Sequence, residues 1–501
     1  MNLEKIKVFV NVMFWIISYR ILGFLRETFI ASRFGAGGES DSYFVAYSLP
    51  NLIVEVFAVG AMSSAIIPIF MQDIRNKEEV KKNISILLGN FLVIGLIFTA
   101  LLILNMKNII EILVPGFNEE SKIITISLSR IAIIIIPALF FNEVLTSFLN
   151  CHNKTSNISF SNFLQNFNFL LFSTVLGKFL GIKGFIYSLT LAVFFKVVYN
   201  YIVLSRCVGF FTIKINFKNA KFKNVLKLLF PIMISSIGVQ LNFIVDRIIT
   251  SNLAEGSVSY LNYGNKIIQL PLGILLGTTI LTTFPILIEH VQTNNILEIK
   301  KFIKNKIELI LIIMVGITGF IFIFSKWIVI ILFQRGNFAE KEVIELANVL
   351  KYYSTSIVGI SFLTLFQKIF FSLKNTKLPS LINIISIFMN IVLNLILVNK
   401  FKVAGIAIAT SISNIFNAFI LFVFLKLKYN YLEVSCLRIV KILIFNVLIF
   451  IISYLIRDYF FNYNEYCLLK KYFIFLCITS FYLTLYLMLI IKIYYKKGEG
   501  F

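Results

Sequence analysis

The chain has 501 residues, of which 58% are apolar and 14% are charged, whereas an ordinary soluble domain holds roughly 45–50% apolar and about 25% charged residues. Too few polar residues remain to cover a water-soluble surface, which excludes a soluble globular protein. The net charge of +23 does not indicate a nucleic-acid-binding protein, because Lys and Arg punctuate apolar segments and do not gather on one soluble face.

Apolar stretches bounded by charged residues or by Gly, Pro and Asn predict fourteen transmembrane helices. In chain order they span residues 8–33, 41–71, 84–104, 123–149, 157–177, 184–204, 228–251, 261–288, 307–325, 343–371, 380–399, 403–425, 439–456 and 472–491. Fourteen spans of about 20 residues need roughly 280 apolar positions, and the composition supplies about 290. We therefore predict an all-α polytopic membrane protein with little sequence outside the membrane.

The N-terminal segment predicts a retained helix and no cleaved signal peptide. It begins with Lys5 and Lys7, continues into apolar sequence that contains Arg20 and Arg26, and lacks a small-residue cleavage site. With the N-terminus in the cytoplasm, the cytoplasmic loops hold about twice as many Lys and Arg residues as the opposite loops. We expect an even number of helices and both termini in the cytoplasm.

The sequence contains an internal repeat with an offset of about 220 residues. The paired segments are Pro115-Gly116-Phe117 with Gly336-Asn337-Phe338, Leu49-Pro50 with Leu270-Pro271, Arg26-Glu27 with Val245-Asp246, Ser147-Phe148-Leu149-Asn150 with Ser372-Leu373-Lys374-Asn375, and Lys183-Gly184 with Ala404-Gly405. Each copy holds six helices, so both enter the membrane in the same sense, and substrate sites of such parallel repeats lie at their interface. We predict an N-lobe at 1–222 with helices one to six, a C-lobe at 223–427 with helices seven to twelve, and two extra helices at 428–501.

Charged residues inside the predicted spans are the strongest candidates for function, because each costs at least about 2.5 kcal/mol to place in hydrocarbon. They concentrate on helices one, two, seven and eight, as a cavity between the two repeats requires. The members are Arg20, Arg26, Glu27, Arg33, Asp41, Glu55, Asp246, Arg247 and Lys266. Charges that lie nearer the predicted helix ends or stand alone are predicted to extend toward the membrane surface; these include Arg130, Glu143, Lys196, Lys351 and Lys368.

Two interpretations of this charged cluster stay open. Arg20 and Glu27 are seven residues apart and share a helical face, which fits a structural ion-pair network. Alternatively, uncompensated cations line a water-filled cavity and bind an anion, since Arg suits bidentate contacts with phosphate. These cations are Arg20, Arg26, Arg247 and Lys266. Basic residues outnumber acidic ones in these helices, which favours anion binding.

A second polar group lies mainly in the C-lobe. Asn390 and Asn394 are one helical turn apart on helix eleven, Thr410 is on helix twelve, and Asp246 is on helix seven. One carboxylate with several neutral oxygens suits a hard cation, so a sodium site is one hypothesis. Hydrogen bonds between helices are the alternative, which is the more common role of Asn and Thr in membranes.

Pro50 and Pro271 lie within helices two and eight, where kinks would let the helices bend during gating, although simple packing explains them equally well. Glu27 and Glu55 are assigned to the cavity on the same helices as the cations and Pro50. The sequence contains no Walker loop, GxSxG or HExxH motif. We therefore predict a transporter and not an enzyme, without a cofactor, driven by an ion gradient such as sodium, by the membrane potential or by the substrate's own gradient.

Several segments together resemble one known family. In helices one and two they are Ser18-Tyr19-Arg20-Ile21-Leu22-Gly23-Phe24-Leu25-Arg26-Glu27, Phe34-Gly35-Ala36-Gly37, Asp41-Ser42-Tyr43-Phe44-Val45-Ala46, Leu49-Pro50-Asn51-Leu52, Phe57-Ala58-Val59-Gly60-Ala61 and Pro68. In helices seven and eight they are Asn242 through Arg247, Gly256-Ser257-Val258-Ser259, Leu261-Asn262-Tyr263 and Leu270-Pro271-Leu272-Gly273. Together with the fourteen predicted helices, these segments resemble the lipid II flippase family called MurJ or MviN over essentially the whole chain.

The resemblance implies a member of the multidrug/oligosaccharidyl-lipid/polysaccharide exporter superfamily, with two six-helix lobes forming a V around a cationic cavity. It implies outward movement of lipid II, the undecaprenyl-diphosphate-linked disaccharide-pentapeptide precursor of peptidoglycan, across a bacterial cytoplasmic membrane by alternating access. The helices at 428–501 would form a groove for the polyprenyl tail. The family's cavity residues match Arg20, Arg26, Asp41 and, with Lys where Arg is usual, Lys266.

Two positions depart from the family pattern. Family members commonly have an Arg pair after the Leu-Pro-Asn-Leu segment and a Glu before Gly-Ala, whereas this chain has Val54 with Glu55, and Val59. One cavity cation is therefore missing and an acid stands beside the gap. Either Arg247 or Arg33 compensates, or the cargo differs from lipid II.

Two alternative functions stay open. The first is export of other lipid-linked oligosaccharides or of drugs by a member of the same superfamily, although a drug extruder usually has twelve helices. The second is a non-transporting membrane scaffold, which an appended soluble domain would favour, and no such domain is recognised in the sequence. For partners we expect lipid II or another lipid-linked diphosphate, membrane lipids, cell-wall synthesis proteins and no nucleic acid, with the chain acting as a monomer.

Overall fold

The structure is a computed structural model that describes residues 3–57, 61–71, 76–293, 295–429 and 436–461, together with residues 479, 480, 482 and 484. Every regular element in these ranges is helical, and they contain no strand. A helix satisfies its backbone hydrogen bonds within one segment, which is what a chain in hydrocarbon requires. The predicted all-α membrane fold is confirmed.

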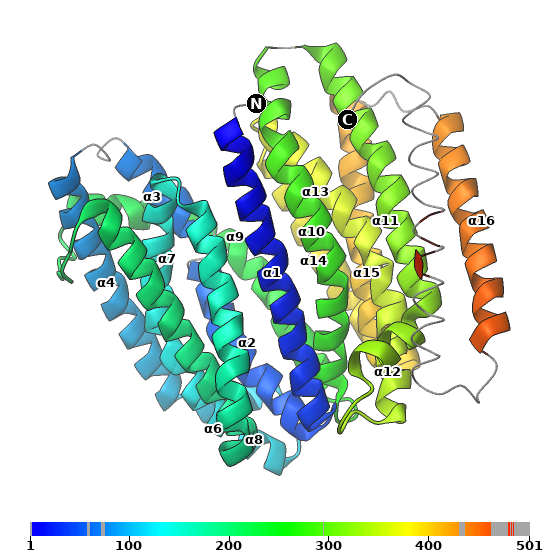
Figure 1. The fold of residues 1–501 in the computed structure, drawn as a ribbon, viewed down its shortest axis with the longest axis horizontal. Helices are drawn as coiled ribbons and strands as arrows, with labels where there is room; N and C mark the ends of the chain where they lie inside the picture. Colours follow the sequence, from blue (N-terminus) through cyan, green and yellow to red (C-terminus); the bar gives the residue numbers. More distant parts are fainter. Residues whose placement is uncertain are drawn as a thin grey trace. The chain divides into compact units, whose positions relative to one another are not determined.

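The chain divides into two compact units, residues 1–262 and 263–501. The first unit holds α1 (Leu3–Phe34), α2 (Gly38–Phe57), α3 (Ala61–Phe70), α4 (Lys77–Leu104), α5 (Met106–Leu113), α6 (Glu119–Ala132), the short η2 (Ile133–Ile135), α7 (Ile136–Cys151), α8 (Thr155–Val208), α9 (Ala220–Ser251) and the first turns of α10 (Ser257–Gln292), coloured blue through green in Figure 1. The second unit holds the rest of α10, α11 (Ile296–Phe333), α12 (Glu340–Ser354), α13 (Ser356–Ser372), α14 (Lys377–Phe401), α15 (Val403–Phe424), the π-helical turn η3 (Leu425–Tyr429) and α16 (Cys436–Phe461). The lobes predicted at 1–222 and 223–427 divide the chain by sequence repeat, which is a different criterion, and they stay a prediction.

Within the described ranges, eight helical segments of at least 18 residues are long and apolar enough to cross a membrane. The predicted spans do not correspond one to one with the helices of the structure. Residues 41–71 divide into α2 and α3, whereas residues 157–177 and 184–204 both belong to α8 as its two arms. Predicted span 472–491 lies almost wholly outside the described residues. The count of fourteen spans therefore stays a prediction.

A turn at Gly181 divides α8 into two arms. A straight helix of its 54 residues would be about 80 Å long, far more than the roughly 30 Å of a bilayer core. Gly181 has a φ of +54°, a left-handed conformation that glycine adopts without steric cost. The chain therefore reverses here, and both arms can lie across the membrane.

The same backbone features recur 221 positions apart, so the internal repeat is visible in the geometry. Left-handed residues form the pairs Gly35 with Gly256, Asn153 with Lys374, and Gly181 with Lys402. The turns at the second pair share their hydrogen bonds, because the N–H of Lys154 donates to Leu149 O and that of Asn375 donates to Phe370 O. This register corrects two of the expected pairings: Arg26 corresponds to Arg247 and not to Val245, and the segment 147–150 corresponds to 368–371 and not to 372–375.

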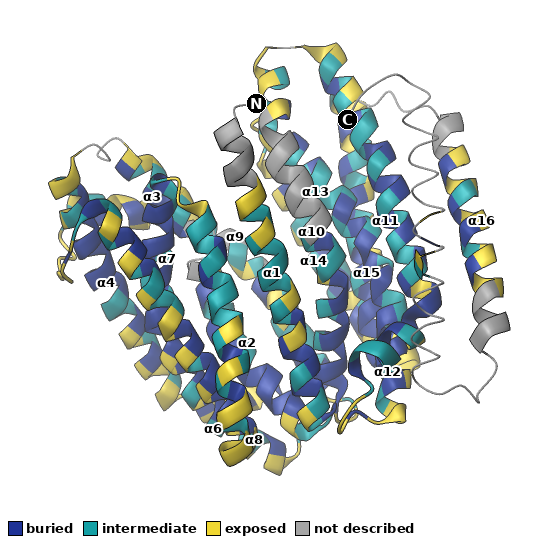
Figure 2. Ribbon diagram, viewed as in Figure 1, coloured by how far each residue is buried: buried dark blue, intermediate teal, exposed yellow. Residues whose placement is uncertain are grey.

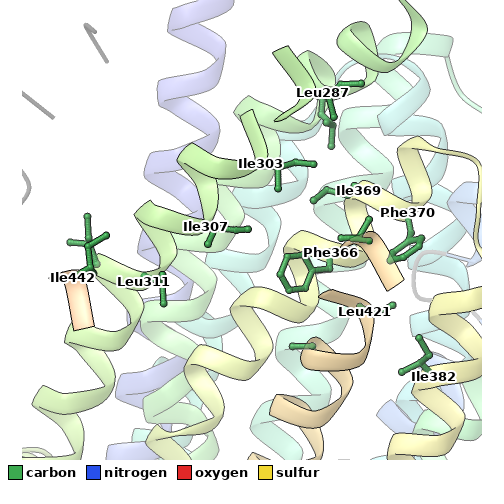
Figure 3. Packing of buried hydrophobic residues seen from close by; sticks show 14 of the residues in the cluster. Leu287, Ile303, Ile307, Leu311, Phe366, Ile369, Phe370, Ile382, Leu421 and Ile442 are labelled. Carbon is green, nitrogen blue, oxygen red and sulfur yellow. The ribbon is translucent and has the colours of Figure 1, made fainter. Parts of the chain in front are cut away.

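Each unit has its own apolar packing. In the second unit, one cluster joins the end of α10 to α11, α13, α14, α15 and α16; its labelled members in Figure 3 are Leu287, Ile303, Ile307, Leu311, Phe366, Ile369, Phe370, Ile382, Leu421 and Ile442. The helices carry both buried and exposed residues (Figure 2). On α14 the exposed residues include Leu381, Ile384, Ile385, Phe388, Val392 and Leu395. This spacing forms an apolar stripe that water-soluble proteins rarely expose and that lipid would cover.

Two corresponding glycines allow close approach of the helices that flank the α8 and α14–α15 turns. A Cβ at Gly184 would lie 2.2 Å from Leu176 O, and one at Gly405 would lie 2.5 Å from Leu397 O. We predict that Gly184→Ala and Gly405→Ala each lower the free energy of unfolding by about 1–3 kcal/mol, because the neighbouring backbone must move.

Thermal unfolding of the purified chain in detergent measures this effect. Gly37→Ala is the matched control, because a Cβ there meets nothing within 4 Å. Equal unfolding temperatures for all three variants would contradict the prediction.

Candidate functional site

The carboxylate of Asp41 binds the beginning of α10 and is 2% exposed. One oxygen accepts hydrogen bonds from the Ser259 backbone N–H at 2.7 Å and from the Ser259 hydroxyl at 2.6 Å, and the other accepts from the Gly256 N–H at 2.8 Å. The N–H groups of a first helical turn have no partner inside the helix, and the helix dipole favours negative charge there. Asp41 therefore acts as a charged cap for α10, and we call this contact the Asp41 clamp.

Local backbone conformation brings the two ends of the clamp together. Gly256 has a φ of +89°, and a Cβ at this position would lie 2.3 Å from Ala36 O. Only glycine permits this approach between the turn before α10 and the turn between α1 and α2. The hydroxyls of Ser40 and Ser259 form a further hydrogen bond at 2.9 Å. Four hydrogen bonds therefore join the two backbone turns at the clamp.

Arg247 lies at the same end of the first unit as the clamp. The residue is 5% exposed, and its guanidinium donates to Asn262 Oδ1 at 3.1 Å and lies 5.2 Å from the centre of the Phe243 ring. The charge of Arg247 also acts on the Asp41 carboxylate. The structure thus brings together two residues predicted to bind substrate, and it places both among protein contacts.

Beside the clamp is a small cavity of about 110 Å³. Its lining includes Gly38, Asp41, Asn118, Ser121 and Glu255. At about 30 Å³ for each water, it has room for only a few water molecules. It is therefore too small to be the binding site of a lipid headgroup.

Arg26 and Glu27 form a buried ion pair. The Arg26 guanidinium is 2.7 Å from a Glu27 oxygen, and the two residues are 5% and 1% exposed. The guanidinium also lies 5.0 Å from the centre of the Tyr47 ring and 5.5 Å from that of Phe169. The expectation that Arg26 is an uncompensated cation is therefore wrong. Sequence spacing missed this pair, because adjacent residues on a helix do not normally face each other.

The other predicted residues of α1 and α9 are less enclosed. Arg20 is half-buried and lies 5.7 Å from the centre of the Tyr19 ring, and Arg33 is exposed beside Phe29. Asp246 is half-buried on α9, and its backbone carbonyl accepts a hydrogen bond from Thr250. Substrate and ion binding by these residues stay predictions.

Glu55 and the two prolines occupy positions on α2 and α10. Glu55 is exposed and accepts a hydrogen bond from Gln240 of α9 at 2.9 Å, while Pro50 is buried inside α2. In the second unit, Lys266 and Pro271 are half-buried on α10. A gating role for the prolines and a substrate-binding role for Lys266 stay predictions.

In the second unit, three of the four residues predicted as sodium ligands are hydrogen-bonded to one another. Asn394 donates to Asn390 Oδ1 at 3.0 Å along α14, and Asn390 donates to the Thr410 hydroxyl of α15 at 3.5 Å. These contacts fit the alternative of hydrogen bonds within and between helices. Asp246 belongs to the first unit, so the four residues stay a predicted set. Across the described ranges, no three His, Cys, Asp or Glu residues cluster in a way that could hold a metal ion.

One polar network was missed by sequence reasoning. Lys196 donates to Gln165 at 3.2 Å between the two arms of α8, and Asn200 donates to Asn142 of α7 at 2.8 Å. Lys196 was expected to extend toward the membrane surface, and that interpretation is wrong because its ammonium is hydrogen-bonded to the neighbouring arm. The sequence signal was the presence of polar residues on two consecutive predicted spans, with Gln165 in 157–177 and Lys196 and Asn200 in 184–204.

Residues 30–488 match the family model described as lipid II flippase MurJ. A probable lipid II flippase MurJ of Buchnera aphidicola subsp. Schizaphis graminum is 30% identical over 439 residues, covering 84% of this chain and 83% of that protein. One of Rickettsia prowazekii is 30% identical over 461 residues, covering 90% of both chains.

Solved structures show the same fold. A structure of lipid II flippase MurJ in an inward closed conformation superposes with a TM-score of 0.81 at 23% identity, covering 98% of this chain and 99% of that one. An inward-facing multidrug resistance MATE transporter of the MOP superfamily gives a TM-score of 0.67 at 15% identity, covering 84% of this chain and 94% of that one.

We predict that Asp41→Asn lowers the free energy of unfolding by about 2–4 kcal/mol. The amide nitrogen of Asn cannot accept a hydrogen bond, so a buried N–H of α10 loses its partner and the charge at the helix terminus is lost. Thermal unfolding of the purified chain gives the comparison. Glu39→Gln, at an exposed acid on the same helix, should have no effect, and an Asp41→Asn variant as stable as this control would contradict the prediction.

We predict that Arg26→Met and Glu27→Leu each destabilise the protein by about 3–5 kcal/mol, because each leaves a buried charge without its partner. The double variant should be more stable than either single variant, since no buried charge remains. A double-mutant cycle based on unfolding measurements tests this. Additive losses would show that the pair has no coupling.

Proposed function

This chain belongs to the MurJ family of lipid II flippases, and we propose that it moves lipid II from the inner to the outer leaflet of the membrane by alternating access. The family match over residues 30–488 is the observation on which the proposal rests. The chain is a multi-pass transporter of the bacterial cytoplasmic membrane and not an enzyme. Its cargo is the lipid-linked precursor of peptidoglycan.

The Asp41 clamp supplies a contact that can close the pathway at one end. By the predicted orientation, the N-terminus of α2 and the N-terminus of α10 lie on the outer side of the membrane. Four short hydrogen bonds hold these two termini together. Outward opening by separation of these termini requires the bonds to break, so the free energy of the clamp sets part of the preference for the outwardly closed state.

We assign binding of the diphosphate to the cationic side chains of Arg20 and Lys266. Both residues are half-buried. Arg26 is a different case, because its guanidinium becomes available to a phosphate only when its bond to Glu27 opens. We assign Arg26 to this later step and not to the first encounter with cargo.

The energy source and the surroundings of the chain are further parts of the proposal. Without an ATP-binding motif in the sequence, transport draws on the membrane potential, on an ion gradient or on the substrate's own gradient. Asp246, Asn390, Asn394 and Thr410 are the predicted ligands for sodium. We place both termini in the cytoplasm and treat the working unit as a monomer. The likeness to MATE transporters is a likeness of fold alone, and it does not favour drug export.

Complementation tests the function directly. In a bacterium depleted of its resident lipid II flippase, expression of this chain should restore lipid II to the outer leaflet, measured by labelling or enzymatic cleavage from outside. Arg20→Ala and Lys266→Ala should weaken cargo binding about 10–100-fold, because a charge-assisted hydrogen bond contributes about 1.5–3 kcal/mol. Rescue should fall accordingly, at unchanged membrane abundance.

Arg33→Ala is the matched control, because Arg33 is an exposed Arg on the same helix. It should rescue as well as the unaltered chain. A properly inserted chain that restores no lipid II would overturn the proposed function. Full rescue by Arg20→Ala and Lys266→Ala would overturn only the assignment of these two cations.

A further inference from the structure

Glu55 is an exposed acid close to the C-terminal end of α2, which ends at Phe57. It lies near the midpoint of the predicted span 41–71, and its neighbour Val54 is buried. Its carboxylate accepts a hydrogen bond from Gln240, and within the described ranges no basic side chain lies within salt-bridge distance of it. A charge facing hydrocarbon at this depth costs at least about 2.5 kcal/mol by insertion scales. The carboxylate therefore faces water and not lipid.

Glu55 ends a polar row along α2 whose members are Tyr43, Tyr47, Asn51 and Glu55. The residues are four positions apart, and each step of four turns about 40° beyond a full helical turn. The row therefore winds around α2, which explains how Tyr47 contacts α1 while Glu55 contacts α9. The Arg26 guanidinium lies over the Tyr47 ring at 5.0 Å, and Glu55 lies eight residues further, about 12 Å along the helix axis.

The row thus has a cation near one end and an uncompensated anion at the other. The charge at position 55 is also opposite to the usual one in the family, because family members commonly have an Arg pair where this chain has Val54 and Glu55. Neither residue considered as a compensating cation lies in a position to neutralise it: Arg247 is hydrogen-bonded to Asn262 near the clamp, and Arg33 lies over Phe29. A mobile cationic group of the cargo is a partner that fits an exposed carboxylate.

We propose that Glu55 binds a protonated amino group on the peptide part of the cargo, while Arg20 and Lys266 hold the diphosphate. The inference rests on the proposed function and adds a specificity-determining residue to it. The diamino acid of a peptidoglycan stem peptide has a side-chain amine, and an unperturbed alkyl amine is protonated at neutral pH. Gln240 holds the carboxylate through one oxygen, which leaves the other oxygen for the ammonium group.

Binding measurements on the purified full-length chain in nanodiscs test the proposal. Two probes are compared: lipid II with a free side-chain amine and lipid II in which that amine is acetylated. The unaltered chain should bind the free amine about tenfold more tightly, the effect of one charge-assisted hydrogen bond. Glu55→Gln should bind both probes with equal affinity, and Glu55→Arg should favour the acetylated probe.

Glu39→Gln is the matched control, an exposed acid on the same helix that should keep the tenfold preference. Unfolding temperatures and binding of the acetylated probe show whether the Glu55 variants are folded, and Glu55→Asp should restore part of the preference. Equal affinities in the unaltered chain, or an undiminished preference in folded Glu55→Gln, would overturn the inference while leaving lipid II transport intact. If neither probe binds, the proposed function itself fails.

Discussion

The hydrogen bonds of the Asp41 carboxylate are the interaction that holds the first turns of α2 and α10 together. It joins three elements that are far apart in sequence, because the turn after α1, the start of α2 and the start of α10 meet around one buried charge. A buried carboxylate is stable only when its oxygens are well supplied with donors, and a helix terminus supplies them without a second charged side chain. Because no cationic side chain is part of the clamp, separation of α2 from α10 would not leave an unpaired cation.

The Arg26–Glu27 pair solves a different physical problem. A guanidinium within a helix bundle needs compensation, and here a carboxylate and two aromatic rings provide it. Breaking such a pair is costly, whereas the pair itself contributes little net stability compared with apolar residues. Its presence in a transporter is therefore better explained by a need for charge at that position than by a need for stability.

Apolar periodicity predicted the helices well, because a span must be apolar over about 20 residues whatever its neighbours are. It also separated the two arms of α8 as spans 157–177 and 184–204, but it could not predict the positive φ of Gly181 at which the chain turns. For the site, sequence placed Asp41, Arg26 and Arg247 on the correct helices but not their partners. Asp41 is held by backbone N–H groups more than 200 residues away, Arg26 by its adjacent residue, and Lys196 by a residue across a turn, and none of these contacts follows from helical spacing.

Comparison of positions 221 residues apart shows which side chains the two repeats share and which occur in one repeat only. Arg26 corresponds to Arg247, and both are 5% exposed and lie over aromatic rings, so both copies of the repeat bury an Arg at this position. Asp41 corresponds to Asn262, which accepts from Arg247, so the negative charge exists only where a helix terminus must be capped. Arg20, Glu27 and Glu55 correspond to Leu241, Ile248 and Leu276, and their charges occur in one repeat only. A headgroup with a diphosphate and a peptide has no twofold symmetry, so charges that differ between the two copies can contact its two ends differently. The residues proposed to contact the cargo, Arg20, Lys266 and Glu55, each carry a charge that their counterparts Leu241, Val45 and Leu276 lack.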